Sequence, residues 1–157
     1  MIELAVIVPL EPMQVGDEFA DLAIPLHVTV LPNVRMRDAA VTELIRQISS
    51  LAADTSVIHT VAREVEVFGP NLDVVVTTLD STVPIRQLHS RLLNAARASG
   101  AESTESAFNS EGYRPHITHT PSGHVPLESA PVTLRALVTV DCTSSVRRII
   151  SAAAFGG

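Results

Sequence analysis

Pro25-Leu26-His27-Val28-Thr29-Val30 is the stretch that decides the fold, because it returns in similar form as Pro115-His116-Ile117-Thr118-His119. Each stretch is short, aliphatic and bounded by proline, as expected for a strand. Residues i and i+2 of a strand point to the same face, so His27 and Thr29 lie side by side while the valines between and after them point into the core. The second stretch repeats this arrangement with its own histidine and threonine.

The rest of the chain supplies further strands and two helices around these stretches. Aliphatic runs predict strands at 4–8, 26–31, 57–68, 72–79, 114–120, 134–140 and 146–155, with 57–68 and 72–79 forming a hairpin around 69–71. Apolar residues at helical spacing predict a helix over about 39–53, with Asp38 as its cap, and a second from Pro84 to Gly100. Residues 11–25 and 100–112 are expected to be loops, the latter mobile. This order predicts the α+β class, a mainly antiparallel sheet, and one domain over 1–157 built from two similar halves.

Composition limits the chemistry that the chain can perform. Its 157 residues include no lysine, since all eleven basic residues are arginines. Lysine adenylates, Schiff bases and Gly-Lys-Ser phosphate loops are therefore excluded. The net charge of −6 and the 3% aromatic content disfavour binding of long nucleic acid, and favour a small anionic substrate in a locally basic site.

Cys142 is the only cysteine, so no internal disulfide forms and a reducing cytoplasm is the expected compartment. A small apolar residue at a strand end is a better interpretation of Cys142 than a catalytic thiol. The N-terminal residues lack a basic region and are expected to begin a strand rather than a signal peptide. No apolar run approaches the ~18 residues that span a membrane, and no membrane partner is expected.

Two strands resemble the two His-x-Thr motifs of the 2H phosphoesterase superfamily, which includes 2′-5′ RNA ligase-like RNA 2′,3′-cyclic phosphodiesterases. They are Pro25-Leu26-His27-Val28-Thr29-Val30-Leu31-Pro32 and Tyr113-Arg114-Pro115-His116-Ile117-Thr118. An aromatic-Arg-Pro-His-x-Thr string is typical of that family, and the element order fits over nearly the whole chain. The resemblance implies a LigT-like fold: two pseudo-symmetric lobes of antiparallel sheet with outer helices, facing each other across a central cleft that His27 and His116 enter from opposite sides.

The resemblance also implies the catalytic roles. One histidine deprotonates the attacking water or hydroxyl and the other protonates the leaving oxygen; the sequence does not assign these roles. Imidazole suits both tasks because its unperturbed pKa is about 6.5. Thr29 and Thr118 can donate hydrogen bonds to the non-bridging oxygens. No metal and no cofactor is required.

Several other polar residues are weaker candidates. Arg114 shares the face of His116 and is a candidate phosphate contact, or equally a solvated arginine at the strand end. Tyr113 is a candidate for stacking on a base, with packing at the strand start as the alternative. Asp141 and Arg135 are candidates to face the cleft from a neighbouring strand. The loop 100–112 is either a lid or a disordered connector.

The remaining histidines are expected to have lesser roles. His119 stands where the family has an aliphatic residue, and by parity it points away from His116, so a packed or hydrogen-bonded histidine is expected. His124 follows Ser122-Gly123 in a loop at the cleft rim or exposed. His59 and His89 are expected to be structural or solvated.

Together these features predict a metal-independent phosphodiesterase acting on a small nucleotide or short RNA, with a monomer as the expected state. Candidate substrates are 2′,3′-cyclic phosphate ends, cyclic oligonucleotides and 2′-5′-linked oligonucleotides. Two alternatives stay open: a non-catalytic nucleotide- or RNA-binding module of the same fold, and a metal hydrolase using His27, His116, His119, His124 and Asp141.

Overall fold

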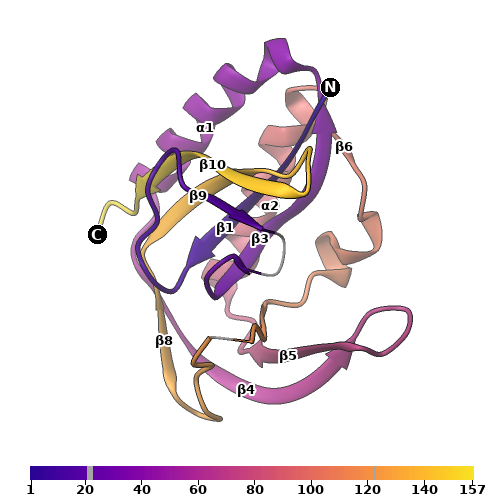
Figure 1. Cartoon of the computed structure of the whole chain (residues 1–157). Helices are drawn as coiled ribbons and strands as arrows, with labels where there is room; N and C mark the ends of the chain where they lie inside the picture. The colour runs from indigo at the N-terminus through magenta and orange to yellow at the C-terminus, as the bar shows by residue number, and fades with distance from the viewer. Residues whose placement is uncertain (21–22, 122) are drawn as a thin grey trace.

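A computed structural model describes residues 1–20, 23–121 and 123–157 (Figure 1). The strands are β1 (Ile2–Pro9), β2 (Glu18–Ala20), β3 (His27–Met36), β4 (Ile58–Phe68), β5 (Val74–Leu79), β6 (Glu102–Ser103), β7 (His116–Thr118), β8 (Pro131–Leu134), β9 (Ala136–Asp141) and β10 (Val146–Ala154). The helices are α1 (Val41–Ala53) and α2 (Val83–Ala98), with 3-10 turns η2 (Asp38–Ala40), η3 (Ser106–Phe108) and η4 (Ser110–Gly112).

The strands of this part of the chain form one sheet in the order β2-β10-β9-β1-β3-β7-β5-β4-β8, with β6 beside β3. Their pairings are antiparallel. The α+β class is thus confirmed, and the two halves join at the centre, where β3 and β7 are neighbours. The C-terminal strands β9 and β10 complete the half that β1 and β3 begin.

The sheet is curled. β8 and β9 stand ninth and third in the order, yet only Arg135 separates them in the chain. A single residue spans at most about 3.6 Å, so the far end of the sheet has to return towards β9. In Figure 1 the orange chain runs directly from β8 into β9 on the left of the molecule.

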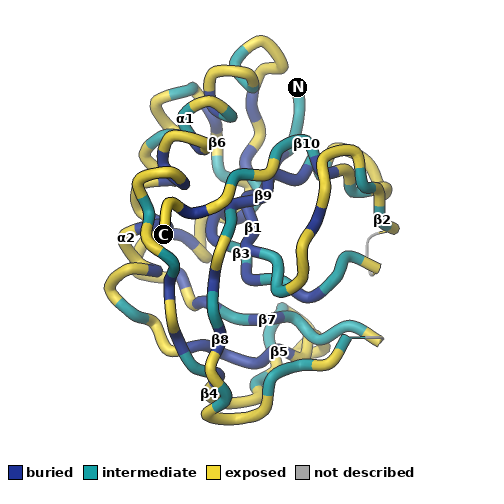
Figure 2. The backbone as a smooth tube through the Cα atoms, turned by 90° about the vertical axis from the view of Figure 1, so that its left-hand side faces the viewer, coloured by how far each residue is buried: buried dark blue, intermediate teal, exposed yellow. Residues whose placement is uncertain are grey.

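The main core lies between the sheet and the helices. Both helices lie on one side of the sheet (Figure 2), where Val28 of β3 and Ile117 of β7 have no exposed surface. A smaller cluster covers part of the other face, because Ile7, Val138, Val140 and Ile149 pack with Met13 from the segment after β1. The aliphatic composition therefore supplies two apolar layers, one on each side of the N-terminal half of the sheet.

Several predicted elements need correction. Asp38 does not cap α1; it opens η2, and its carboxylate lies 3.0 Å from the N-terminal ammonium. The predicted strand 134–140 is interrupted at Arg135, and the strand 114–120 shortens to β7. The predicted loop 11–25 contains β2, while its residues 21–22 lie outside the described residues, as does Ser122 of the predicted loop before His124.

The segment 100–112 is also more regular than expected. It contains β6, η3 and η4. The amide and hydroxyl of Thr104 both donate to the carbonyl of Asn33, at 3.0 and 3.1 Å. The amide of Asn33 in turn donates to the carboxylate of Glu105 at 3.3 Å. These bonds hold the segment against β3, which the polar composition of the segment did not reveal.

Candidate active site

The four motif side chains lie on one face of the sheet, on its two central strands. Val28 pairs with Ile117 in the antiparallel register of β3 and β7. The residues on either side then oppose each other, so His27 faces Thr118 and Thr29 faces His116. Directly opposed residues have Cβ atoms about 5 Å apart and diagonal ones roughly 7–8 Å, which is the separation expected for the two histidines.

This face is the one turned away from the helices. Val28 and Ile117 pack in the main core, and by alternation the motif side chains point the other way. All four are half-buried. The sheet therefore presents two imidazoles and two hydroxyls together, each pair anchored from behind by an aliphatic residue.

The two histidines are held in the same way. Nδ1 of His27 lies 2.9 Å from the carbonyl oxygen of Pro25, and Nδ1 of His116 lies 2.7 Å from that of Arg114. A carbonyl only accepts, so Nδ1 carries the proton and donates in both rings. Nε2 is then the nitrogen of each ring that can take up or deliver a proton at the site. Within residues 1–20, 23–121 and 123–157, no group forms a hydrogen bond with Nε2 of either histidine.

The environment favours the neutral form of both imidazoles. Burial lowers the pKa of His27 below its usual 6.5, and repulsion from His116 lowers it further, against the opposing effect of the Pro25 carbonyl. Burial also lowers the pKa of His116, with the charge of Arg114 acting in the same direction. The effect of His116 on the pKa of His27 agrees with the separation between the two rings that the register predicts.

The strand β4 contributes residues around His116 that the sequence did not single out. The ring of Phe68 meets the imidazole of His116 edge to face, with centroids 4.9 Å apart. Arg114 stacks over the same Phe68 ring at 4.9 Å and pairs with Glu66 at 2.8 Å. Alternation along 57–68 places Glu66 and Phe68 on one face, but only the pairing of β4, β5 and β7 brings that face to the motif.

Arg114 is therefore at the site but already has an acidic partner. Its side chain is 56% exposed, and a pair so open to water contributes little stability, about 0–1 kcal/mol. The guanidinium can exchange Glu66 for a phosphate at small cost. Arg114 remains a candidate phosphate contact.

Tyr113 packs inside the protein and does not present its ring to solvent. It is 8% exposed, its ring stacks on His89 with centroids 4.1 Å apart, and its hydroxyl donates to the carbonyl of Thr29 at 2.9 Å. Burial raises its pKa. Stacking of Tyr113 on a base, one of the two sequence hypotheses, does not fit this placement.

His89 extends this link between the two motifs. It is fully buried on α2, its Nδ1 donates to the carbonyl of Val30 at 2.8 Å, and its Nε2 accepts from the amide of Ser110 at 2.9 Å. The ring is thus neutral, and burial lowers its pKa. The structural interpretation of His89 is confirmed. Its contacts join α2, the first motif strand and the turn that precedes Tyr113.

The other histidines lie apart from the pair. Nε2 of His119 is 2.7 Å from the hydroxyl of Thr77, so the expectation of a hydrogen-bonded residue holds. His59 and His124 are exposed. The described residues hold no group of three or more His, Cys, Asp or Glu side chains arranged to bind a metal ion.

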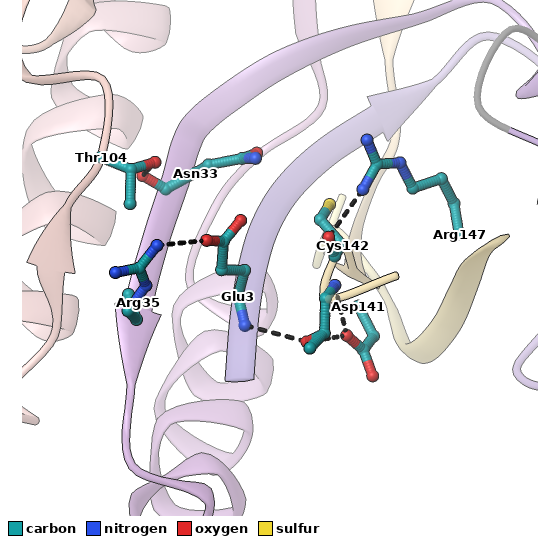
Figure 3. Close-up of polar contacts among 8 residues, drawn as sticks. Glu3, Asn33, Arg35, Thr104, Asp141, Cys142 and Arg147 are labelled. Carbon is teal, nitrogen blue, oxygen red and sulfur yellow. Dashed lines mark hydrogen bonds and ion pairs between the residues drawn. The ribbon is translucent and has the colours of Figure 1, made fainter. Parts of the chain in front are cut away.

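Asp141 and Cys142 lie at the opposite end of β1 from the motif. Asp141 pairs with Leu4 while Pro9 pairs with His27. Figure 3 shows Asp141 and Cys142 at this corner, near Glu3. The carboxylate of Asp141 accepts hydrogen bonds from the backbone amide and the hydroxyl of Thr143. Burial raises the pKa of Cys142 to about 11, which is the opposite of what a reactive thiol requires. Asp141 is not at the motif face, contrary to expectation.

The chain resembles several solved structures along its whole length. They include a crystal structure described as a phosphoesterase (TM-score 0.65, 15% identity), TT0787 of Thermus thermophilus (0.67, 15%) and Escherichia coli LigT complexed with NADP+ (0.64, 13%). Each alignment covers 99% of this chain and 98–99% of the other. No curated protein sequence matches the chain. Neither helix of the described chain is long and apolar enough to cross a membrane.

The sequence itself matches a family model. The match runs over residues 8–138 and includes both motif strands, and the model describes the 2'-5' RNA ligase superfamily. The curled antiparallel sheet with two helices is the fold of the LigT structures. The chain belongs to the 2'-5' RNA ligase superfamily of 2H phosphoesterases.

Proposed function

We propose that the protein is a metal-independent phosphodiesterase that hydrolyses a small nucleotide phosphodiester by general acid and base catalysis from His27 and His116. One observation carries this proposal. The two histidines lie diagonally on neighbouring strands of one sheet face, with Nδ1 of each held by a backbone carbonyl, so both Nε2 atoms are available at one site.

The geometry suits displacement at phosphorus, which needs an attacking and a leaving oxygen roughly in line. A phosphate between diagonal imidazoles has one Nε2 near each of these oxygens. Each histidine opposes a threonine on the other strand, and the two hydroxyls can donate to the non-bridging oxygens, where negative charge accumulates. Fixing Nδ1–H keeps the basic lone pair on the nitrogen that faces the reaction.

The protonation states of the two histidines fit a mechanism in which substrate binding prepares one of them to act as the acid. Both imidazoles have lowered pKa values, so both are neutral in the free protein near pH 7. A bound phosphate brings negative charge within a few ångströms, which raises the pKa of a neighbouring imidazole. One histidine can then bind the proton that it later delivers to the leaving oxygen, while the other remains the base.

A small nucleotide or short RNA is the substrate class that the remaining features support. Escherichia coli LigT, whose fold this chain shares, is known in complexes with 3'-AMP, with ATP and with phosphate. The net charge of −6 disfavours long RNA. We infer further that a monomer acting in the cytoplasm is the working form, because one chain carries both motifs and the single cysteine forms no internal disulfide.

The test is turnover in excess EDTA on a 2′,3′-cyclic nucleotide, a cyclic dinucleotide and a 2′-5′ dinucleotide. His27→Ala and His116→Ala should each lower kcat by about 10²-fold or more. His59→Ala is the matched control, since this histidine is exposed on β4, and should retain wild-type turnover. Loss of activity in EDTA would indicate the metal hydrolase, and nucleotide binding without turnover would indicate the binding module.

A further inference from the structure

A hollow of about 390 Å³ opens on the histidine face, beside the first motif. Its lining includes Pro9, Glu11, Arg135, Val138, Ala152 and Ala154. None of these residues belongs to the motif strands. The volume lies within the range of sites that bind small molecules.

The register of the sheet fixes where the hollow lies relative to His27. Pro9 is the direct cross-strand partner of His27, so this edge of the hollow lies about 5 Å from the histidine, one strand away. The amide of Leu10, which also lines the hollow, donates to the carbonyl of Leu26 at 3.0 Å. The Pro9 edge of the hollow is therefore one strand away from the first motif, while Met13, another lining residue, packs on the same face with Ile7 and Val138.

The same register shows that the hollow and the histidines share one face. Ile7 pairs with Thr29 on one side and with Val138 on the other. Ala152 pairs with Val138, and Ala154 with Ala136 two residues along β9. Opposed residues point to the same face, so the floor of the hollow continues the face that carries Thr29.

The lining combines an apolar floor with two charged side chains at its edge. The accessible part of the floor is made by alanine side chains of β10 and by Pro9 and Pro12, while Val138 and Met13 are buried. This small apolar surface suits the flat face of a base. Arg135 stands at the turn between β8 and β9, and its guanidinium has no ion pair or hydrogen-bond partner among the residues that the structure describes. Glu11 is the other charged residue of the lining, and a carboxylate can accept from the amino group of a base.

An exposed arginine without a partner is suited to a phosphate, because its planar guanidinium can donate two parallel hydrogen bonds to two phosphate oxygens. The motif face already holds the reacting phosphate. A second phosphate at Arg135 would lie beyond a nucleoside that occupies the apolar floor.

We propose that this hollow binds the nucleoside attached to the reacting phosphodiester, and that Arg135 pairs with the phosphate on the 5′ side of that nucleoside. The inference rests on the proposed function for the position of the reacting phosphate. It predicts that the protein prefers nucleotides and short oligonucleotides that carry a second phosphate to nucleosides whose only phosphate is the cyclic one.

The test compares two probes that differ by one group: adenosine 2′,3′-cyclic phosphate with and without a 5′-phosphate. The wild type should prefer the 5′-phosphorylated probe by about tenfold in kcat/KM, the range expected for one charge-assisted hydrogen-bonded contact. Arg135→Ala should abolish this preference and leave turnover of the unphosphorylated probe within about twofold. Arg135→Lys should keep part of the preference, because the charge remains.

Two further variants separate the site from general effects. Arg91→Ala removes an exposed arginine from α2, on the other side of the sheet, and should leave the preference unchanged. Ala152→Phe fills the floor at an exposed position of β10, so the protein should fold while binding of both probes weakens by about tenfold. The backbone carbonyl of Arg135, which accepts from Phe155 at 2.8 Å, is retained in both Arg135 variants.

Calorimetric titration with adenosine 3′-phosphate and adenosine 3′,5′-bisphosphate measures binding without turnover. The inference is supported if the wild type binds the bisphosphate more tightly than the monophosphate and Arg135→Ala binds the two equally. This result would support the inference even if neither cyclic probe is hydrolysed and the proposed function fails. Equal affinity and equal kcat/KM for the members of each pair would overturn the inference, as would a preference that persists in Arg135→Ala. In that case turnover that depends on His27 and His116 would still support the proposed function.

Discussion

Tyr113→Phe removes one oxygen atom and tests the link between the two motif strands. The hydroxyl donates to the carbonyl of Thr29 at 2.9 Å, and the side chain is 8% exposed. A net hydrogen bond contributes about 1 kcal/mol, and a buried carbonyl that loses a donor adds to the cost. We therefore expect the free energy of unfolding to fall by about 1–2 kcal/mol, a drop in Tm of roughly 3–7 °C for a chain of this length.

Urea denaturation and a thermal melt followed by circular dichroism measure this change. The phenylalanine ring keeps its stacking on His89, so the loss reports the hydroxyl alone. Ser49→Ala is a matched control that deletes an exposed hydroxyl from α1, and its stability should stay within about 0.5 kcal/mol of the wild type. A Tyr113→Phe protein as stable as the wild type would refute the buried hydrogen bond between the strands.

Three further outcomes are expected. Burial lowers the pKa of both motif histidines below 6.5, so in mild acid the unfolded chain binds more protons than the folded protein. The free energy of unfolding should therefore fall as the pH drops below 6.5. Replacing both histidines by asparagine should flatten this dependence of stability on pH, and an unchanged dependence would contradict the lowered pKa values. Gly112→Ala should destabilise by about 1–3 kcal/mol in urea denaturation, since a Cβ there would collide with the carbonyl of Ala107; a neutral substitution would contradict that packing. Arg114→Ala should raise KM for a phosphate-bearing substrate several-fold and Glu66→Gln should lower it, because Glu66 competes with phosphate for the guanidinium; opposite shifts would remove Arg114 from the site.

The local pattern of the sequence was sufficient to identify the two motifs and their orientation. The alternation of side chains along a strand depends only on backbone geometry. The sequence alone therefore showed that His27 and Thr29 share one face of their strand and that the valines next to them point to the other face. Repetition of the pattern in the second half supplied the family resemblance that the match over residues 8–138 confirms. The hairpin between β4 and β5 and the extent of α2 followed for the same local reason.

Errors arose where tertiary contacts override local preference. Polar composition predicted a mobile segment at 100–112, but hydrogen bonds to Asn33 hold it against β3. The alternating run 134–140 predicted one strand, whereas the curl of the sheet requires a break at Arg135. Tyr113 carried a base-stacking hypothesis that its burial against His89 excludes.

By itself, the sequence determined which side chains share a strand face, because that follows from a period of two residues. Only the tertiary structure decided which strands are neighbours. The pairing of Val28 with Ile117 sets His27 diagonal to His116, and the return of β9 beside β1 creates the hollow next to Pro9. Such pairings join residues far apart in the chain, and they depend on how the whole sheet packs against its helices, which no local pattern encodes.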